Sequence, residues 1–315
     1  MLITMLDTKT LGHDLDFSLF EDFGQLEKYD FTYPQEVEQR IINSDCVIIN
    51  KIKLNKQNLQ NAKKLKIICI AATGYDNVDT EYCAQRGIAV CNVVGYSTYS
   101  VAQTCVAMVL SLSSHLLEYN NMVTSGKYTQ SNVPNCISPT FYEIKDKTWG
   151  VLGLGNIGKQ TAAVAKALGA RVICCKQTYV DDYECVDFDE LCRRSDIITI
   201  HLPYTSKTDK LINKESISKM KDGVMLVNVA RGKILDEEAV AQAVESGKIG
   251  AFGTDVYSVE PLQNESPFSR LPGLTNVCFT PHMAWAAYES RKRLMDEIYQ
   301  NIKAFENGQT RNRVV

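Results

Sequence analysis

The sequence of 315 residues lacks several features that would assign a class of protein at once. No apolar run approaches the ~18–20 residues that would cross a bilayer, and no low-complexity segment or internal repeat stands out. The net charge of −3 gives no reason to expect nucleic acid or an anionic membrane as a partner. The first residues, Met1–Asp7, include no basic residue and no long apolar stretch, so we expect a first strand there and not a signal peptide.

The sequence also has no C-x-x-C pair, although it contains 11 cysteines. Most of them fall within apolar runs, and the adjacent Cys174 and Cys175 would point to opposite faces of a strand. This pattern is typical of reduced thiols that serve as small core residues. We therefore predict no metal site and no disulfide scaffold, and a reducing, cytoplasmic location.

Short apolar runs alternate with helical stretches twice along the chain, which predicts two α/β domains with parallel sheets. The first series has expected strands at 2–6, 46–50, 67–71 and 88–91, and helices at 34–43 and 55–64. A helix from Val101 to about Asn120 follows, and 127–138 is expected to be a surface loop. The second series has expected strands at 148–152, 171–175, 196–200, 224–227 and 249–253, and helices at 157–168, 189–194, 214–220 and 237–246. An amphipathic helix, 288–306, comes last.

A glycine-rich turn, Gly153-Leu154-Gly155-Asn156-Ile157-Gly158, joins the expected strand 148–152 to the helix after it. In such a turn the first glycine permits a tight bend, the second lets the backbone approach a pyrophosphate, and the third lets helix and strand pack closely. The phosphate would bind the free N–H groups of the helix N-terminus. The alternative is a purely structural corner, but the position of the turn in a repeated β/α pattern favours a dinucleotide.

Lys176 follows the second strand of this domain, where NAD-binding proteins usually have an acidic residue that accepts hydrogen bonds from the adenosine ribose. A lysine cannot accept those bonds, and its charge would suit the 2′-phosphate of NADP. The alternative is a solvated lysine at a strand end. NAD and NADP therefore both stay open as the cofactor.

Histidine is the usual side chain for proton transfer near neutral pH, and the chain has four. His13 lies in a polar stretch and His115 in a helical one, so we expect both to be structural or solvated. His201 and His282 each lie beside a proline-marked strand end. Doubly wound sheets bind ligands at the carboxyl ends of their strands, so both are candidate site residues.

Two charged residues could complete a site around His282. Glu260 could hold the imidazole by a hydrogen bond to one ring nitrogen, which fixes the tautomer. Arg231, just after the strand 224–227, could bind a carboxylate with two parallel hydrogen bonds. Taken singly, each would be interpreted as a surface charge, and the sequence alone does not bring them together.

The order of these motifs resembles the D-2-hydroxyacid dehydrogenase family over nearly the whole chain. The resemblance rests on Ala72–Asp79 (ATGYDNVD), the glycine turn, His201-Leu202-Pro203, and the segments around Arg231, Glu260 and His282. Within the family, 96–103 and 281–286 most resemble the glycerate dehydrogenase/hydroxypyruvate reductase branch.

The resemblance implies two doubly wound domains. A flavodoxin-like substrate domain would comprise residues 1–98 plus 287–315, and a Rossmann-type dinucleotide-binding domain, 99–286, would be inserted into it. The implied activity is hydride transfer between NAD(P)H and a small 2-oxo acid, of the hydroxypyruvate/glycerate or glyoxylate/glycolate type. The active site would lie in the cleft, and the helix from Val101 would help to form a homodimer.

The resemblance also implies roles for single residues. His282 would donate a proton to the carbonyl oxygen, Glu260 would hold the imidazole, and Arg231 would bind the carboxylate and carbonyl of the substrate. Further substrate contacts would come from Thr73, Gly74 and Trp285. The implied cofactor contacts are Gly153, Gly155, Asn156, Ile157, Gly158, Lys176, His201, Pro203, Ala230 and Asp255, the last on the nicotinamide carboxamide.

One further departure from the family, and two competing functions, remain. Cys105 stands where many relatives have a threonine near the cofactor, and Thr104 could partly replace that contact. A nicotinamide-sensing regulatory protein is one alternative, but it would not need the proton donor His282. Formate or phosphite oxidation is another, but the formate branch has glutamine where this chain has Glu260.

Overall fold

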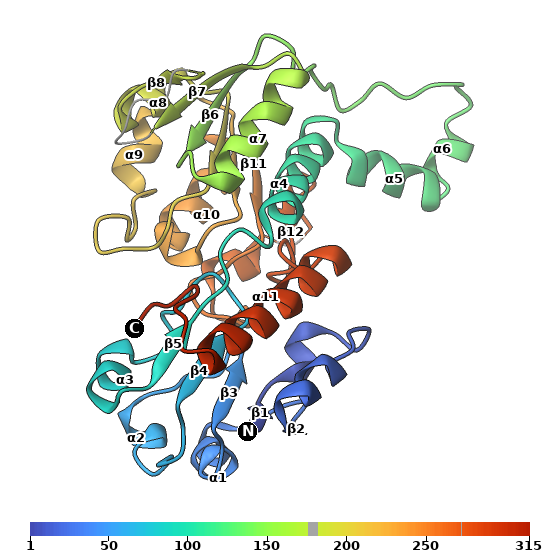
Figure 1. Ribbon diagram of the computed structural model, residues 1–315. Coiled ribbons are helices and arrows are strands. Elements are labelled where there is room, and N and C mark those ends of the chain that lie inside the picture. Colours follow the sequence, from blue (N-terminus) through green and yellow to red (C-terminus); the bar gives the residue numbers. More distant parts are fainter. Residues whose placement is uncertain (176–181, 272) are drawn as a thin grey trace. The chain divides into compact units, whose positions relative to one another are not determined.

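Two compact units make up the chain in the computed structural model, which describes residues 1–175, 182–271 and 273–315. Unit 1 comprises Met1–Ser97 and Ala286–Val315, and unit 2 comprises Thr98–Trp285. Each unit has one sheet of parallel strands with helices packed around it (Figure 1). The expected fold class, α/β with two parallel sheets, is confirmed.

The sheet of unit 1 has five strands in the order β2-β1-β3-β4-β5. Their bounds are β1 Leu2–Met5, β2 Gln25–Lys28, β3 Cys46–Ile49, β4 Ile67–Ile70 and β5 Ala89–Cys91. Every residue of β3 and β4 is buried, which is why these two strands are continuous apolar runs. The edge strand β2 has no fully buried residue, and its sequence, QLEK, therefore gave no strand signal.

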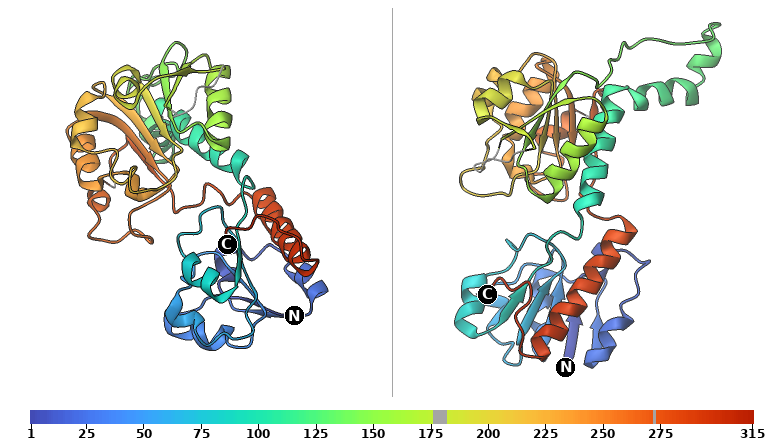
Figure 2. Two further views of the ribbon diagram at one scale, coloured as in Figure 1. Left: turned by 60° about the vertical axis from the view of Figure 1, so that its left-hand side comes forward. Right: turned by 45° about the horizontal axis from the view of Figure 1, so that its top comes forward.

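The helices of unit 1 are α1 Val37–Ile41, α2 Lys56–Leu59, α3 Thr80–Arg86 and α11 Tyr288–Glu306. The last of these returns from the end of the sequence and packs on β4 (Figure 2). The expected helix at 55–64 is wrong in length, since α2 stops at Leu59. Its start agrees with the prediction to within one residue, since Asn55 caps the helix and its side chain accepts hydrogen bonds from the N–H groups of Gln57 and Asn58.

The sheet of unit 2 has seven strands in the order β12-β11-β10-β9-β6-β7-β8. Their bounds are β6 Thr148–Leu152, β7 Arg171–Cys175, β8 Glu184–Cys185, β9 Ile197–Ile200, β10 Val224–Asn228, β11 Ile249–Thr254 and β12 Val277–Phe279. The sequence predicted the five central strands and missed β8 and β12. Both lie at the edges of the sheet and have no fully buried residue, so they lack a long apolar run.

The helices of unit 2 are α4 Thr98–Ser113, α5 Leu116–Thr124, α6 Lys127–Gln130, α7 Asn156–Ala167, α8 Phe188–Arg194, α9 Lys214–Lys219 and α10 Glu237–Glu245. The expected helix from Val101 to Asn120 is wrong, because it breaks after Ser113 at His115, whose φ of 50° is left-handed. The expected loop at 127–138 is also wrong in part, since α6 lies within it.

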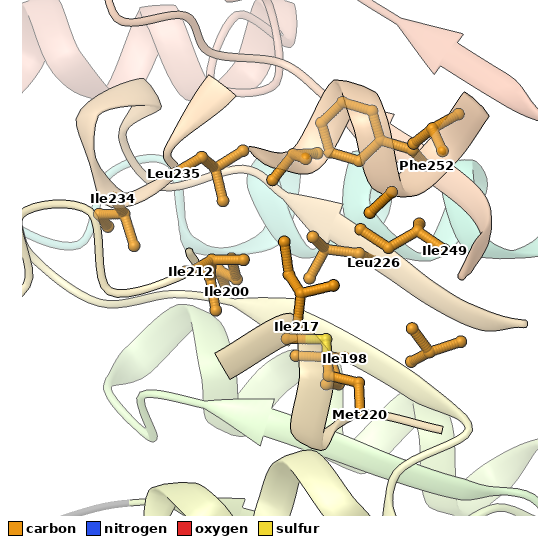
Figure 3. Packing of buried hydrophobic residues seen from close by; sticks show 14 of the residues in the cluster. Ile198, Ile200, Ile212, Ile217, Met220, Leu226, Ile234, Leu235, Ile249 and Phe252 are labelled. Carbon is orange, nitrogen blue, oxygen red and sulfur yellow. The ribbon is translucent and has the colours of Figure 1, made fainter. Parts of the chain in front are cut away.

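Apolar side chains from strands and helices form the core of unit 2. Figure 3 shows this packing, with labelled residues Ile198, Ile200, Ile212, Ile217, Met220, Leu226, Ile234, Leu235, Ile249 and Phe252. Each such side chain contributes roughly 1.5–3 kcal/mol when it is fully buried. This core fixes the central strands, and it thereby fixes the positions of the loops that follow them.

No single helix within the described ranges is long and apolar enough to cross a membrane. The pair α4 and α5, which bends by 64°, passes that test together by length and composition only.

Candidate functional site

The candidate residues of unit 2 lie along one edge of its sheet. Gly153 follows β6, His201 follows β9, and Arg231 comes shortly after β10. Asp255 follows β11, and His282 comes shortly after β12. These strands are parallel, so their carboxyl ends share the edge at which doubly wound sheets bind ligands.

His282 and Glu260 form a close pair at this edge. The imidazole Nδ1 lies 2.6 Å from Oε2 of Glu260, and the side chains are 23% and 31% exposed. The other carboxylate oxygen, Oε1, accepts a hydrogen bond of 3.1 Å from the backbone N–H of Tyr257. A carboxylate accepts from Nδ1–H, so a proton exchanged with a ligand would pass through Nε2.

Asp255 holds the turn that carries His282. Its carboxylate accepts hydrogen bonds from Oγ1 of Thr280 at 2.5 Å and from the N–H groups of Met283 at 2.8 Å and Ala284 at 2.9 Å. Asp255 is only 1% exposed, so these bonds are shielded from water. They surround His282, whose φ of 53° is left-handed, a conformation that persists only when the surroundings impose it.

Two aromatic side chains brace the same turn. Nε1 of Trp285 donates to the carbonyl oxygen of His282 at 2.9 Å. The hydroxyl of Tyr257 donates to the carbonyl oxygen of Thr280 at 3.0 Å. Burial, followed by the charges of Asp255 and Glu260, raises the pKa of Tyr257 to about 12, so this hydroxyl keeps its proton at neutral pH. His282 is therefore held in place through both its ring and its backbone carbonyl group.

Glu237 and Gly232 support the loop that carries Glu260, and neither was predicted from the sequence. The Glu237 carboxylate accepts from the N–H of Ser258 at 2.7 Å and from the hydroxyl of Ser266 at 3.1 Å. A side chain at Gly232 would overlap the backbone of Tyr257 and Ser258, so only glycine fits there. Glu237 stands in the first turn of α10, where an acidic residue stabilises the helix dipole. Its position in the sequence therefore gave no indication of a role in the site.

Arg231 is held by its backbone while its guanidinium makes one local contact. Asn228 at the end of β10 donates from Nδ2 to the carbonyl oxygen of Arg231 at 2.9 Å and accepts from the N–H of Ala230 at 3.0 Å. The guanidinium Nη1 donates to the carbonyl oxygen of Ala230 at 2.8 Å. Within the described part of the chain Arg231 forms no ion pair, so its remaining donors are available to an anion.

The glycine turn has the shape that a dinucleotide phosphate needs. Gly153 has a φ of +100°, and a side chain at Gly158 would overlap the carbonyl oxygen of Gly153. At Gly155, by contrast, an added Cβ would meet no atom within 4 Å, so the turn is open there. Helix α7 begins at the next residue, Asn156, and its first N–H groups have no partner within the helix. These residues fit a bound pyrophosphate.

His201 also fits a ligand-binding role. Both of its ring nitrogens are buried, and neither finds a hydrogen-bond partner among the described residues. Burial lowers the pKa of His201 to about 3, so the ring is neutral near pH 7. A buried polar atom without a partner is uncommon in a folded protein, and a bound cofactor would supply one.

Some predicted residues lie elsewhere or lack a described position. Lys176 lies outside the described residues. Thr73 and Gly74 belong to unit 1, in the loop after β4, where the Thr73 hydroxyl donates to Val93 O at 2.8 Å. Cys105 is fully buried in α4, and burial raises the pKa of its thiol.

His13 and His115 lie outside the cluster around His282. His115 occupies the N-cap position of α5 without a side-chain cap bond, its Nδ1 lies 3.8 Å from Oε2 of Glu118, and His13 belongs to unit 1. Over the ranges that the structure covers, no group of three or more His, Cys, Asp or Glu side chains is arranged to hold a metal ion.

Comparison with known proteins assigns this arrangement to a family. Residues 106–284 match the family model for the D-isomer specific 2-hydroxyacid dehydrogenase, NAD binding domain. A hydroxypyruvate reductase of Blautia hydrogenotrophica is 36% identical over 98% of each chain. A D-lactate dehydrogenase structure from Aquifex aeolicus, in complex with NAD and lactic acid, has a TM-score of 0.86 and 29% identity over 98% of this chain and 96% of that one.

An acyclic imino acid reductase in complex with NADPH and D-Arg is similar as well, with a TM-score of 0.89 and 27% identity over 100% of both chains. These likenesses span both units, and a nicotinamide cofactor accompanies each of these two structures. The chain therefore belongs to the D-isomer specific 2-hydroxyacid dehydrogenases, and it is an oxidoreductase that uses a nicotinamide cofactor.

Proposed function

We propose that this protein reduces a small 2-oxo acid to the D-2-hydroxy acid, with hydroxypyruvate as the preferred substrate and glyoxylate next. The observation that carries the proposal is the His282–Glu260 pair on a turn that Asp255 holds in place. The similarity to a hydroxypyruvate reductase over nearly the full length supports this choice of substrate. A sensing role has no use for a histidine positioned for proton transfer.

The reaction needs one hydride and one proton. A bound reduced nicotinamide would supply the hydride. Protonated His282 donates from Nε2 to the carbonyl oxygen as negative charge develops there, because Nδ1 is engaged by Glu260. The Glu260 carboxylate stabilises the imidazolium before transfer and holds the ring orientation after it. In the reverse direction, neutral His282 accepts the proton of the alcohol.

Substrate binding would rest on Arg231 and on the loop after β4. The free guanidinium donors of Arg231 suit a carboxylate together with the neighbouring carbonyl oxygen. Backbone N–H groups at Thr73 and Gly74 would bind the carboxylate, and the hydrogen bond from Thr73 to Val93 O holds that loop. Trp285 would limit the size of the substrate side chain. The Trp285 ring is largely buried and donates to the carbonyl oxygen of His282.

Cofactor binding would use the open glycine turn, the neutral ring of His201, and Pro203 and Ala230, which come shortly after β9 and β10. Asp255 accepts three hydrogen bonds and has capacity for one more, which suits the amide of the nicotinamide. We propose that both NADH and NADPH serve, because Lys176 takes the position of the usual acidic residue and would attract a 2′-phosphate.

A homodimer remains a proposal, supported by an apolar arm. Helices α5 and α6 extend from the rest of unit 2 (Figure 2), and α5 has no buried residue. Large apolar side chains more than half exposed lie along this arm, namely Leu116, Leu117, Val123, Val133, Ile137, Phe141 and Tyr142. A second copy would remove this apolar surface from water. A cytoplasmic location also remains a proposal, supported by 11 cysteines that are all free thiols.

The proposal is tested by reduced-nicotinamide absorbance with hydroxypyruvate, glyoxylate, pyruvate and a branched 2-oxo acid, each with NADH and with NADPH. We expect the highest kcat/KM for hydroxypyruvate and turnover with both cofactors. Lys176→Asp should shift preference toward NADH and leave substrate order unchanged. Cofactor binding without turnover on any of the four acids would contradict the proposal and favour the sensing function.

A further inference from the structure

Two cysteines face each other on neighbouring strands beside the glycine turn. Cys174 on β7 and Cys185 on β8 are directly paired in the parallel register. Their Sγ atoms are 3.2 Å apart. A disulfide bond needs about 2.05 Å between the sulfurs, so the two thiols would have to approach by about 1 Å.

The pair combines one protected thiol with one that solvent can reach. Cys174 is fully buried, whereas Cys185 is partly exposed. Cys175, the next residue along β7, is also partly exposed, but successive residues of a strand point to opposite faces. An oxidant from solvent would therefore meet Cys185 first, with Cys174 already placed as the second thiol.

We propose that Cys174 and Cys185 form a reversible disulfide that weakens cofactor binding, with a small disulfide such as oxidised glutathione as the oxidant. The Cys185 thiolate attacks one sulfur of glutathione disulfide, forms a mixed disulfide and releases one glutathione thiolate. Cys174, after losing its proton to the released glutathione thiolate, attacks Sγ of Cys185 and displaces the second glutathione. The two protein thiols are oxidised by two electrons, and one glutathione disulfide is reduced to two glutathione thiols.

The link to the cofactor passes through the backbone of β7. The carbonyl oxygen of Cys175 accepts a hydrogen bond of 3.2 Å from the N–H of Gly153, the first residue of the glycine turn. Drawing Cys174 toward β8 shifts the end of β7 and strains that bond. The loss of one neutral hydrogen bond from the glycine turn corresponds to a roughly 2- to 10-fold weaker affinity for the cofactor. The His282–Glu260 pair follows other strands, so kcat should change little.

The experiment exposes the full-length protein to mixtures of oxidised and reduced glutathione, blocks free thiols and digests with trypsin. Cleavage after Arg171, Lys176 and Arg193 gives the peptides 172–176 and 177–193, which the disulfide would join. Mass spectrometry measures the joined pair, and a fluorescence titration with NADH measures cofactor affinity on the same samples. Dithiothreitol should reverse both changes.

Matched serine variants identify the thiols and separate them from Cys192, which shares a peptide with Cys185. We expect Cys174→Ser and Cys185→Ser to lose both the joined peptides and the oxidative loss of NADH affinity. Cys174→Ser should retain glutathione on Cys185. Cys175→Ser, the neighbouring control, should respond like the unmodified chain.

Three results would overturn the proposal. These are no joined peptides with oxidised glutathione in large excess, a disulfide that survives Cys185→Ser, or a complete disulfide that leaves NADH affinity unchanged. None of these results depends on which 2-oxo acid the enzyme reduces, so they also separate this proposal from the proposed function.

Discussion

Replacing Asp255 by asparagine tests whether this carboxylate organises the catalytic turn. The native carboxylate accepts from Thr280 Oγ1, Met283 N–H and Ala284 N–H. Asparagine offers one acceptor oxygen and one amide NH₂ group, which cannot accept. The Thr280 hydroxyl can rotate to accept from the new NH₂ group, but at least one of the two backbone N–H donors loses its partner.

The expected magnitude follows from burial. Ala284 is 2% exposed and Asp255 is 1% exposed, so the unpaired N–H has little access to water. Leaving one buried donor unsatisfied costs about 1–3 kcal/mol, and hydrogen bonds to a neutral amide are weaker than those to a carboxylate. We expect the free energy of unfolding of the cofactor-free protein to fall by about 2–4 kcal/mol.

The assay is urea unfolding of the cofactor-free protein, together with steady-state kinetics below the unfolding transition. Asp255→Asn should also lower kcat, because His282 lies between the residues that Asp255 binds. Asp187→Asn is the matched control, since Asp187 caps α8 through one bond of 2.7 Å to Glu190 N–H, and asparagine caps helices equally well. If both variants unfold and turn over like the native protein, Asp255 does not organise the turn.

Three further predictions concern neighbouring groups. Glu260→Gln should lower kcat for reduction several-fold at neutral pH while the NADH dissociation constant stays constant, because a neutral amide holds and stabilises the imidazolium of His282 less well than a carboxylate does. A native kcat would remove Glu260 from its role. Burial lowers the pKa of His201 to about 3, whereas an unfolded histidine has a pKa of ~6.5. Between these two pH values the unfolded chain binds one more proton than the folded chain. The free energy of unfolding should therefore fall by up to about 1.4 kcal/mol for each pH unit of acidification in this window. His201→Asn should reduce that slope in urea unfolding of the cofactor-free protein, and an unchanged slope would contradict the buried neutral ring. Glu237→Gln should lower kcat several-fold while the NADH dissociation constant stays constant, and a native kcat would show that the Ser258 contact does not position Glu260.

Much of the fold was predictable because the alternation of apolar runs and helices is strong. The strands β6 and β7 have their predicted bounds, since each is an apolar run flanked by turn residues. The order of strand and loop then placed Arg231 and Asp255 after strands of one sheet, whereas β12, the strand before His282, was missed. Short edge strands such as β8 lack this signal, because two residues cannot show a period.

Contacts between distant residues were not predictable in the same way. The hydrogen bond that Asp255 accepts from the N–H of Met283 depends on the pairing of β11 with β12, which no local sequence pattern encodes. The Cys174–Cys185 contact depends likewise on the register of β7 with β8, whereas the sequence drew attention only to the adjacent Cys174 and Cys175. The role of Glu237 was not predictable either, because its partner Ser258 lies in the loop after β11, 21 residues further along the chain.

Turnover of His282→Ala with hydroxypyruvate, measured beside NADH affinity on the same protein, tests the proton-transfer role of His282. We expect a drop in kcat on the order of 10²–10⁴-fold, because the proton donor is gone. The NADH dissociation constant should stay nearly native, because the glycine turn and His201 remain. Unchanged turnover in this variant would contradict the assignment of His282 as the group that moves the proton.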